Sequence, residues 1–156
     1  MERRLREEIQ QSKPFASLEE EVFLEIQRTA QVQSRWVVEA LQPSGLTPSQ
    51  FNVLRILRGA RPDALSSSRI AERMVTHDPD LTRLLDRLEA RELISKTRDA
   101  RDRRVVNVRV TAAGLKIVES ASKAVGVKLR TELRPLGPRK LEALADLLEL
   151  VRDSTA

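Results

Sequence analysis

The sequence predicts a mainly α-helical protein with a winged helix-turn-helix, whose wing sheet has two or three strands, flanked by N- and C-terminal dimerisation helices. Leucines recur at helical spacing over residues 81–88, apolar and polar residues alternate over 105–110, and an arginine-rich turn lies between these segments. A helix followed by a hairpin is the order expected of a winged helix. At 156 residues the chain fits one subunit over 1–156. We expect dimerisation helices at 17–42 and 111–153 and a winged-helix lobe at 46–110.

A long first helix is expected over residues 18 to about 41. Ser17 with Glu20 three residues later is the pattern of a capping box. Apolar residues then recur at helical spacing, and the Pro-Ser-Gly segment at 43–45 ends the pattern.

The next two start signals predict two helices, the second of which, with the tight turn at 76–78 and the helix after it, forms a helix-turn-helix. Residues 47–50, Thr-Pro-Ser-Gln, place proline at the first helical position and glutamine at the third, which predicts a helix to about Arg58. After a turn at 59–64 and a short strand at Leu65, a serine begins the second helix. Either Ser66 or Ser67 is its cap, and its apolar residues are Ile70, Ala71, Met74 and Val75.

The helix that follows is the candidate recognition helix. Asp78 is expected to cap it, with Pro79 at the first helical position and Asp80 near the positive end of the helix dipole. An ordinary amphipathic surface helix has the same division of faces, so the helix alone does not establish binding. The inner face is Leu81, Leu84, Leu85 and Leu88, and the outer face is Thr82, Arg83, Asp86 and Arg87.

The wing is expected to be an antiparallel hairpin with a basic tip. Valines at 106, 108 and 110 predict a half-buried strand that pairs with residues 94–98. Residues 94–110 hold six cations and two aspartates, a net charge of +4 in a chain whose net charge is +5. Such a cluster repels itself unless a polyanion such as nucleic acid neutralises it. The alternative is a solvated charged turn that protects the hairpin edge from aggregation.

Two helices are expected after the wing. Thr111 begins the first, and residues 135–138 separate it from a last helix over Arg139 to about Arg152. We expect part of the last helix to face a second subunit, the alternative being a wide core stripe. Its apolar residues are Leu141, Leu144, Ala145, Leu147, Leu148, Leu150 and Val151.

The composition argues against several functions. There is no cysteine, which excludes disulfides, thiolate metal sites and a thiol-oxidation switch. The single histidine, His77, is expected in a turn, and no carboxylate pair, metal-ligand spacing or phosphate-binding glycine loop is present. We therefore expect no catalysis, cofactor or metal. Residues 1–15 lack the apolar core of a signal peptide and no run is long enough to span a membrane, so we expect a cytoplasmic protein.

Residues 46–115 carry a family resemblance. The runs LTPSQFNVLRIL, SSRIAERM and DLTRLLDRLEARELI, then RDARDRR and VVNVRVTAAG, resemble the MarR family of dimeric winged-helix transcription regulators. The most specific part is Asp102-Arg103-Arg104 at its distance from LTRLLDRLE. One residue departs from the pattern: the family usually has glycine at the position of Glu92, where the backbone often becomes left-handed.

The resemblance implies a homodimeric, sequence-specific regulator that binds double-stranded DNA, a repressor in many members. Its near-palindromic site is expected to have half-sites roughly 10 base pairs apart. Thr82 and Arg83 are expected at base edges and Arg87 nearer the backbone, while Asp86 accepts from cytosine or orients an arginine. In the wing, Arg101 is expected in or beside the minor groove, and Arg98, Arg103 and Arg104 on phosphate. Asp99 and Asp102 are expected to fix the turn and aim the guanidinium groups.

The resemblance also implies a small anionic or phenolic ligand between the dimerisation helices and the lobe. For each expected lining residue, packing or ordinary surface is the alternative. For the whole lobe, the alternative is a winged helix that binds protein instead of DNA. The choice between repressor and activator stays open. The expected lining residues are Gln31, Arg35, Trp36, Phe51 and Asn52.

Overall fold

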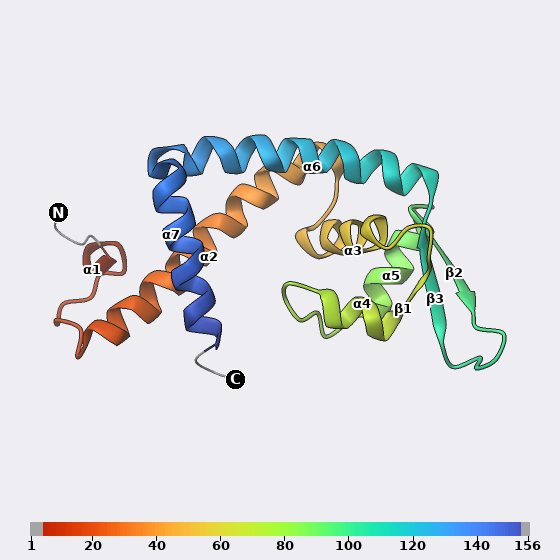
Figure 1. Ribbon diagram of the computed structural model, residues 1–156, viewed down its shortest axis with the longest axis horizontal. Coiled ribbons are helices and arrows are strands. Elements are labelled where there is room, and N and C mark those ends of the chain that lie inside the picture. The colour runs from red at the N-terminus through yellow and green to blue at the C-terminus, as the bar shows by residue number, and fades with distance from the viewer. Residues whose placement is uncertain (1–4, 154–156) are drawn as a thin grey trace.

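The computed structural model describes residues 5–153, so residues 1–4 and 154–156 of the expected subunit lie outside it. A lobe of short helices and a small sheet lies at one end, and long helices extend away from it (Figure 1). The mainly helical winged-helix class is confirmed. The elements are α1 (Leu5–Glu8), α2 (Leu18–Leu41), η1 (Gln42–Ser44), α3 (Pro48–Gly59), β1 (Leu65–Ser66), α4 (Ser67–Arg73), α5 (Leu81–Ala90), β2 (Ile94–Arg98), β3 (Val106–Val110), α6 (Ala112–Leu133), η2 (Arg134–Leu136) and α7 (Gly137–Asp153).

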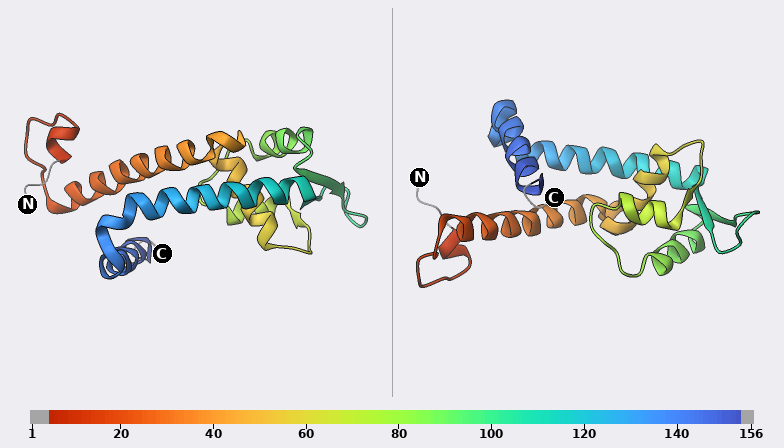
Figure 2. Two further views of the ribbon diagram at one scale, coloured as in Figure 1. Left: turned by 90° about the horizontal axis from the view of Figure 1, so that it is seen from above. Right: turned by 60° about the horizontal axis from the view of Figure 1, so that its bottom comes forward.

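Helices α2 and α6 lie side by side and form the long arm of the subunit (Figure 2). Lys128 of α6 joins them through an ion pair of 2.9 Å to Glu39 of α2. The start of α2 differs slightly from the expected capping box. Ser17 accepts from the Glu20 N–H at 3.2 Å, but the Glu20 carboxylate reaches past Ser17 and accepts from the Ala16 N–H at 2.6 Å.

Side-chain caps fix the starts of α3 and of α4, the first helix of the helix-turn-helix. Thr47 and Gln50 form a complete capping box at the start of α3, with distances of 3.2 and 3.1 Å. Ser66, not Ser67, caps α4. Helix α4 ends at Arg73, so Val75, which we expected on its apolar face, lies beyond the helix and is 86% exposed.

Helix α5 begins later than the sequence indicated. The expected cap, Asp78, instead accepts from the Asp80 N–H at 3.0 Å, which closes a turn over Pro79. This local bond competes with helix formation, because an aspartate that bonds two residues onward stabilises a turn. Helix α5 therefore starts at Leu81, after Asp80, whose side chain makes no cap bond.

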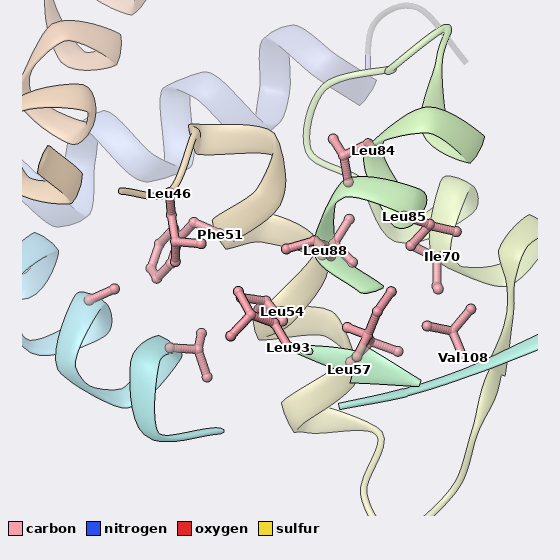
Figure 3. Packing of buried hydrophobic residues seen from close by; sticks show 14 of the residues in the cluster. Leu46, Phe51, Leu54, Leu57, Ile70, Leu84, Leu85, Leu88, Leu93 and Val108 are labelled. Carbon is pink, nitrogen blue, oxygen red and sulfur yellow. The ribbon is translucent and has the colours of Figure 1, made fainter. Parts of the chain in front are cut away.

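The core fills the lobe (Figure 3) and continues onto α2 and α6 through Leu41, Val118, Ala121 and Val125. Leu84, Leu85 and Leu88 of α5 are buried, as expected from their shared face, and they pack with residues of α3 and the sheet. The three strands are antiparallel in the order β1-β3-β2, which places Val108 in the centre, fully buried and opposite both Leu65 and Lys96.

Helix α7 contributes no buried residue to the lobe core. Several of its apolar side chains are exposed: Leu144, Leu147, Leu150 and Val151. This exposure fits the expectation that α7 faces a second subunit rather than the alternative of a wide core stripe. None of the helices within residues 5–153 combines the length and apolar character needed to cross a membrane.

A close backbone contact joins α5, β2 and α6. The Leu93 carbonyl accepts from the Thr111 N–H at 3.1 Å, and the Thr111 hydroxyl donates to the Glu92 carbonyl at 2.7 Å. Gly114, in the first turn of α6, lies against the same carbonyl. A Cβ at Gly114 would lie 2.0 Å from the Leu93 oxygen, so this position has no space for a side chain.

We therefore expect Gly114→Ala to lower the free energy of unfolding by about 2–3 kcal/mol, because backbone atoms must move to admit the methyl group. Gly59→Ala is the matched control, since a Cβ there meets nothing within 4 Å. Urea denaturation of both variants measures the difference. Equal stability of the two variants would contradict the close contact.

Candidate nucleic-acid interface

The outer face of α5 presents polar and charged side chains to solvent. Thr82, Arg83, Asp86 and Arg87 are all exposed, while the leucines on the other face anchor the helix in the core. The Arg83 side chain is 72% exposed, and its guanidinium lies 3.5 Å from the Asp80 carboxylate. Such an exposed ion pair is weak, so Arg83 remains available to another hydrogen-bond acceptor.

The turn of the wing is organised by Asp99. Its carboxylate accepts from the Arg101 N–H at 2.8 Å, from the Asp102 N–H at 3.2 Å and from the Asn107 side-chain amide at 3.0 Å. These bonds, led by that from the Arg101 N–H, lower the pKa of Asp99. The carboxylate therefore stays ionised in the turn and holds its backbone in one conformation.

Asp102 makes a similar bond, accepting from the Arg104 N–H at 2.9 Å. We expected Asp99 and Asp102 both to fix the turn and to aim the guanidinium groups. The backbone bonds serve the first role. No contact supports the second, because within residues 5–153 neither carboxylate forms an ion pair with an arginine. The wing arginines are exposed, namely Arg98, Arg101, Arg103 and Arg104.

Lys96 links the recognition helix to the wing, a role that we did not predict from the sequence. Its ammonium forms ion pairs with Asp86 and, at 2.8 Å, with Glu89, and its backbone N–H donates to Glu89 at 3.1 Å. Hydrogen bonds to Asp86 first and Glu89 second raise the pKa of Lys96. The available signal was that Lys96 shares a strand face with buried Ile94 and follows two acids three residues apart.

Asp86 therefore contacts the wing through its ion pair with Lys96. We expected it to accept from cytosine or to orient an arginine, and its partner in the structure is Lys96. Its side chain remains 57% exposed, so it keeps acceptor capacity on the solvent side.

A separate cavity of about 230 Å³ lies between the arm and the lobe. Phe51 and Asn52 line it, as expected, and the Arg55 guanidinium lies 5.6 Å from the centre of the Phe51 ring. The expected residues of α2 do not line this cavity: Gln31 and Arg35 are exposed, and Trp36 is half-buried. The remaining lining residues are Val37, Pro48, Ser49, Met74, Val75, Thr76, Val125 and Leu129.

Within residues 5–153, no group of three or more acidic or histidine side chains is placed to hold a metal ion.

The sequence is similar to known transcription regulators. A model of the MarR family matches residues 46–106. The HTH-type transcriptional repressor MdtR of Bacillus subtilis is 37% identical over 78 residues, which span 50% of this chain and 49% of that protein. The multiple antibiotic resistance protein MarR of Escherichia coli is 31% identical over 103 residues, 66% of this chain and 70% of that protein. The chain belongs to the MarR family.

Solved structures extend the likeness to the arm. A MarR transcription factor from Planctomyces limnophilus is 36% identical, with a TM-score of 0.68 over 88% of this chain and 99% of that one. A mutant MarR from E. coli, crystallised with operator DNA, is 26% identical, with a TM-score of 0.76 over 87% of this chain and 99% of that one.

The departure at Glu92 from the MarR-family pattern is visible in the backbone. Glu92 has a φ of 57°, the left-handed conformation in which the family usually places glycine. The strain of a non-glycine residue there is on the order of 1 kcal/mol.

We expect Lys96→Met to lower the free energy of unfolding by about 1 kcal/mol at low salt, since it leaves two neighbouring carboxylates without their cation. Screening of their repulsion at high salt should reduce this loss. Lys116→Met is the matched control, because Lys116 is exposed on α6 and within residues 5–153 has no ion pair. Urea denaturation at both salt concentrations measures the effect. A loss that is equal in the two variants would contradict the link.

Proposed function

We propose that this MarR-family chain is a regulator, not an enzyme, that binds double-stranded DNA sequence-specifically as a homodimer. The observation that carries the proposal is the wing turn, where Asp99 fixes the backbone while four arginines around it point to solvent. Holding like charges together is unfavourable unless a polyanion approaches them. The operator complex of E. coli MarR, which has this fold, supports the same partner here.

Helix α5 would enter the major groove with its exposed face toward the bases. Arg83 would exchange its weak contact with Asp80 for guanine, whose O6 and N7 accept a bidentate guanidinium, and Thr82 would contact a neighbouring base edge. Arg87 would contact the backbone. Asp86, already neutralised by Lys96 on one side, would accept from cytosine on the other, because the ion pair reduces its repulsion from phosphate.

The wing would follow the backbone into the adjacent minor groove. Arg101, at the tip, would enter the groove or lie beside it, where the negative potential is greatest. Arg98, Arg103 and Arg104 would contact phosphates. If each subunit neutralises about three phosphates, the slope of log affinity against log salt is near −5 for the dimer.

The partner subunit would cover the exposed apolar residues of the arm. Leu147 and Leu150 on α7 are 61% and 65% exposed, and Phe23 on α2 is 57% exposed. Pairing through these helices gives a twofold axis between two lobes, so the operator is a near-palindrome with half-sites about 10 base pairs apart.

The cavity between the arm and the lobe would hold a small anionic or phenolic ligand. Arg55 supplies a cation at its wall and Phe51 an aromatic ring. Because the cavity contacts both α6 and the loop before α5, a ligand there would change how the lobe is held and release the DNA. We therefore propose a ligand-released repressor that acts in the cytoplasm, where its DNA is.

The wing arginines give the direct test. We expect Arg101→Ala and Arg104→Ala each to weaken binding to all duplexes and to flatten the salt slope of the dimer by about two, since each substitution removes one cation near the DNA backbone from both subunits. Arg83→Ala should instead relax base preference. Fluorescence anisotropy with a duplex selected from a random library, and with a scrambled duplex, measures both effects.

Lys123→Ala, an exposed position on α6, is the control for general charge. A salt slope that is unchanged in both wing variants would contradict the wing contacts. Failure of the unmodified protein to bind any duplex or heparin at low salt would favour a protein-interaction module.

The dimer is tested on α7. We expect Leu147→Glu combined with Leu150→Glu to convert the dimer to a monomer, because two charges would be buried against apolar side chains. Glu149→Gln is the control on the same helix. Sedimentation velocity gives the mass of each, and a dimer that survives the double substitution would show that α7 is not in the interface.

A further inference from the structure

A second hollow, of about 630 Å³, lies on the lobe between the end of α3, β1, α4 and β3. It shares no lining residue with the cavity between the arm and the lobe. Its wall is mostly polar, and the residues that matter here are Asp63, Arg69, Arg73, Asn107 and Arg109.

Three guanidinium groups line this arginine hollow. Arg69 and Arg73 lie one turn apart on α4, and Arg109 comes from β3, against a single acid, Asp63. Like charges one helical turn apart repel each other. Within residues 5–153, none of the three forms an ion pair, and Arg109 makes one hydrogen bond, to the Pro62 carbonyl at 3.3 Å. The hollow is therefore a site of unneutralised positive charge with most of its donors unused.

This arrangement selects its ligand chemistry. A guanidinium presents parallel N–H donors that match two oxygens of a phosphate, and several guanidiniums around one hollow match a group with more than one charge. A monovalent anion would satisfy only part of this charge. We propose that the arginine hollow is a phosphate-binding site, separate from the DNA contacts of α5 and the wing tip.

A phosphate there would connect two functional elements. Arg69 and Arg73 belong to the first helix of the helix-turn-helix, whereas Arg109 belongs to the wing strand. Asn107, which also lines the hollow, donates its side-chain amide to Asp99 in the wing turn. Phosphate bridging α4 and β3 would thus restrain the wing at its base.

The phosphate has two chemical sources, a free polyphosphate or the DNA backbone outside the half-sites. The first experiment uses the full chain without DNA. Sodium pyrophosphate is titrated at constant ionic strength and followed by calorimetry and by the side-chain amide NMR signal of Asn107. We expect saturable binding that is about tenfold weaker in the Arg69→Gln, Arg73→Gln double variant. Arg139→Gln, an exposed arginine on α7, is the control and should bind as the unmodified chain does.

The second experiment compares the binding of two duplexes, one that ends at the half-sites and one that is longer by a helical turn on each side. If the phosphate belongs to the backbone, the double variant loses affinity for the long duplex and not for the short one. The proposal is overturned if the double variant binds pyrophosphate and both duplexes as the control variant does. This inference goes beyond the proposed function. If the chain bound pyrophosphate but no duplex, the phosphate site would be supported and the proposed DNA-binding function would be contradicted.

Discussion

The carbonyl oxygen of Leu93 is the point where the recognition helix, the wing and the arm meet. Helix α5 ends with the Glu92 and Leu93 N–H groups donating to the carbonyls of Glu89 and Leu88. Leu93 directly precedes β2, and its carbonyl accepts from the Thr111 N–H at the start of α6. Gly114 allows α6 to lie against it without a side chain between them. The orientation of α5 relative to α6 is therefore set by the backbone.

Side-chain contacts of Lys96 and Arg91 brace this junction. Lys96 ties β2 to α5, and Arg91 donates to the carbonyls of Gly45 and Ser44 at 2.9 and 3.2 Å, beside the start of α3. Asp86 and Glu89 pair with Lys96, Asp99 and Asp102 accept from backbone N–H groups, and the wing arginines remain exposed. Within residues 5–153 these acids form no ion pair with the wing arginines, so a chain of modest net charge has a strongly basic wing turn.

Local patterns predicted most of the fold. The Thr47 capping box, the leucine face of α5 and the valine alternation of β3 all depend on residues close in sequence, whereas the left-handed position of Glu92 was expected from the family resemblance. The errors have the same origin. Aspartate is a residue type that often caps a helix, but Asp78 instead accepts from the Asp80 N–H and closes a turn, a local bond that competes with the cap.

Features that depend on tertiary contact were harder to predict. The link from Lys96 to Asp86 and Glu89 joins residues of different elements, so the strand and helix periods indicate the faces that these residues occupy but not that the two faces meet. The lining of the cavity between the arm and the lobe was predicted for Phe51 and Asn52 but not for Val125, which comes from α6. The choice of Gln31 and Arg35 assumed a packing angle for α2 that no local pattern determines.

Because backbone contacts at Leu93 join α6 to the lobe, α6 would act as a lever. Its 22 residues make a rod about 33 Å long. A tilt of only about five degrees, pivoting at the far end of such a rod, moves the lobe by roughly 3 Å, a large part of the strand spacing in a sheet. Small adjustments where two subunits touch would then be magnified at the grooves of the double helix.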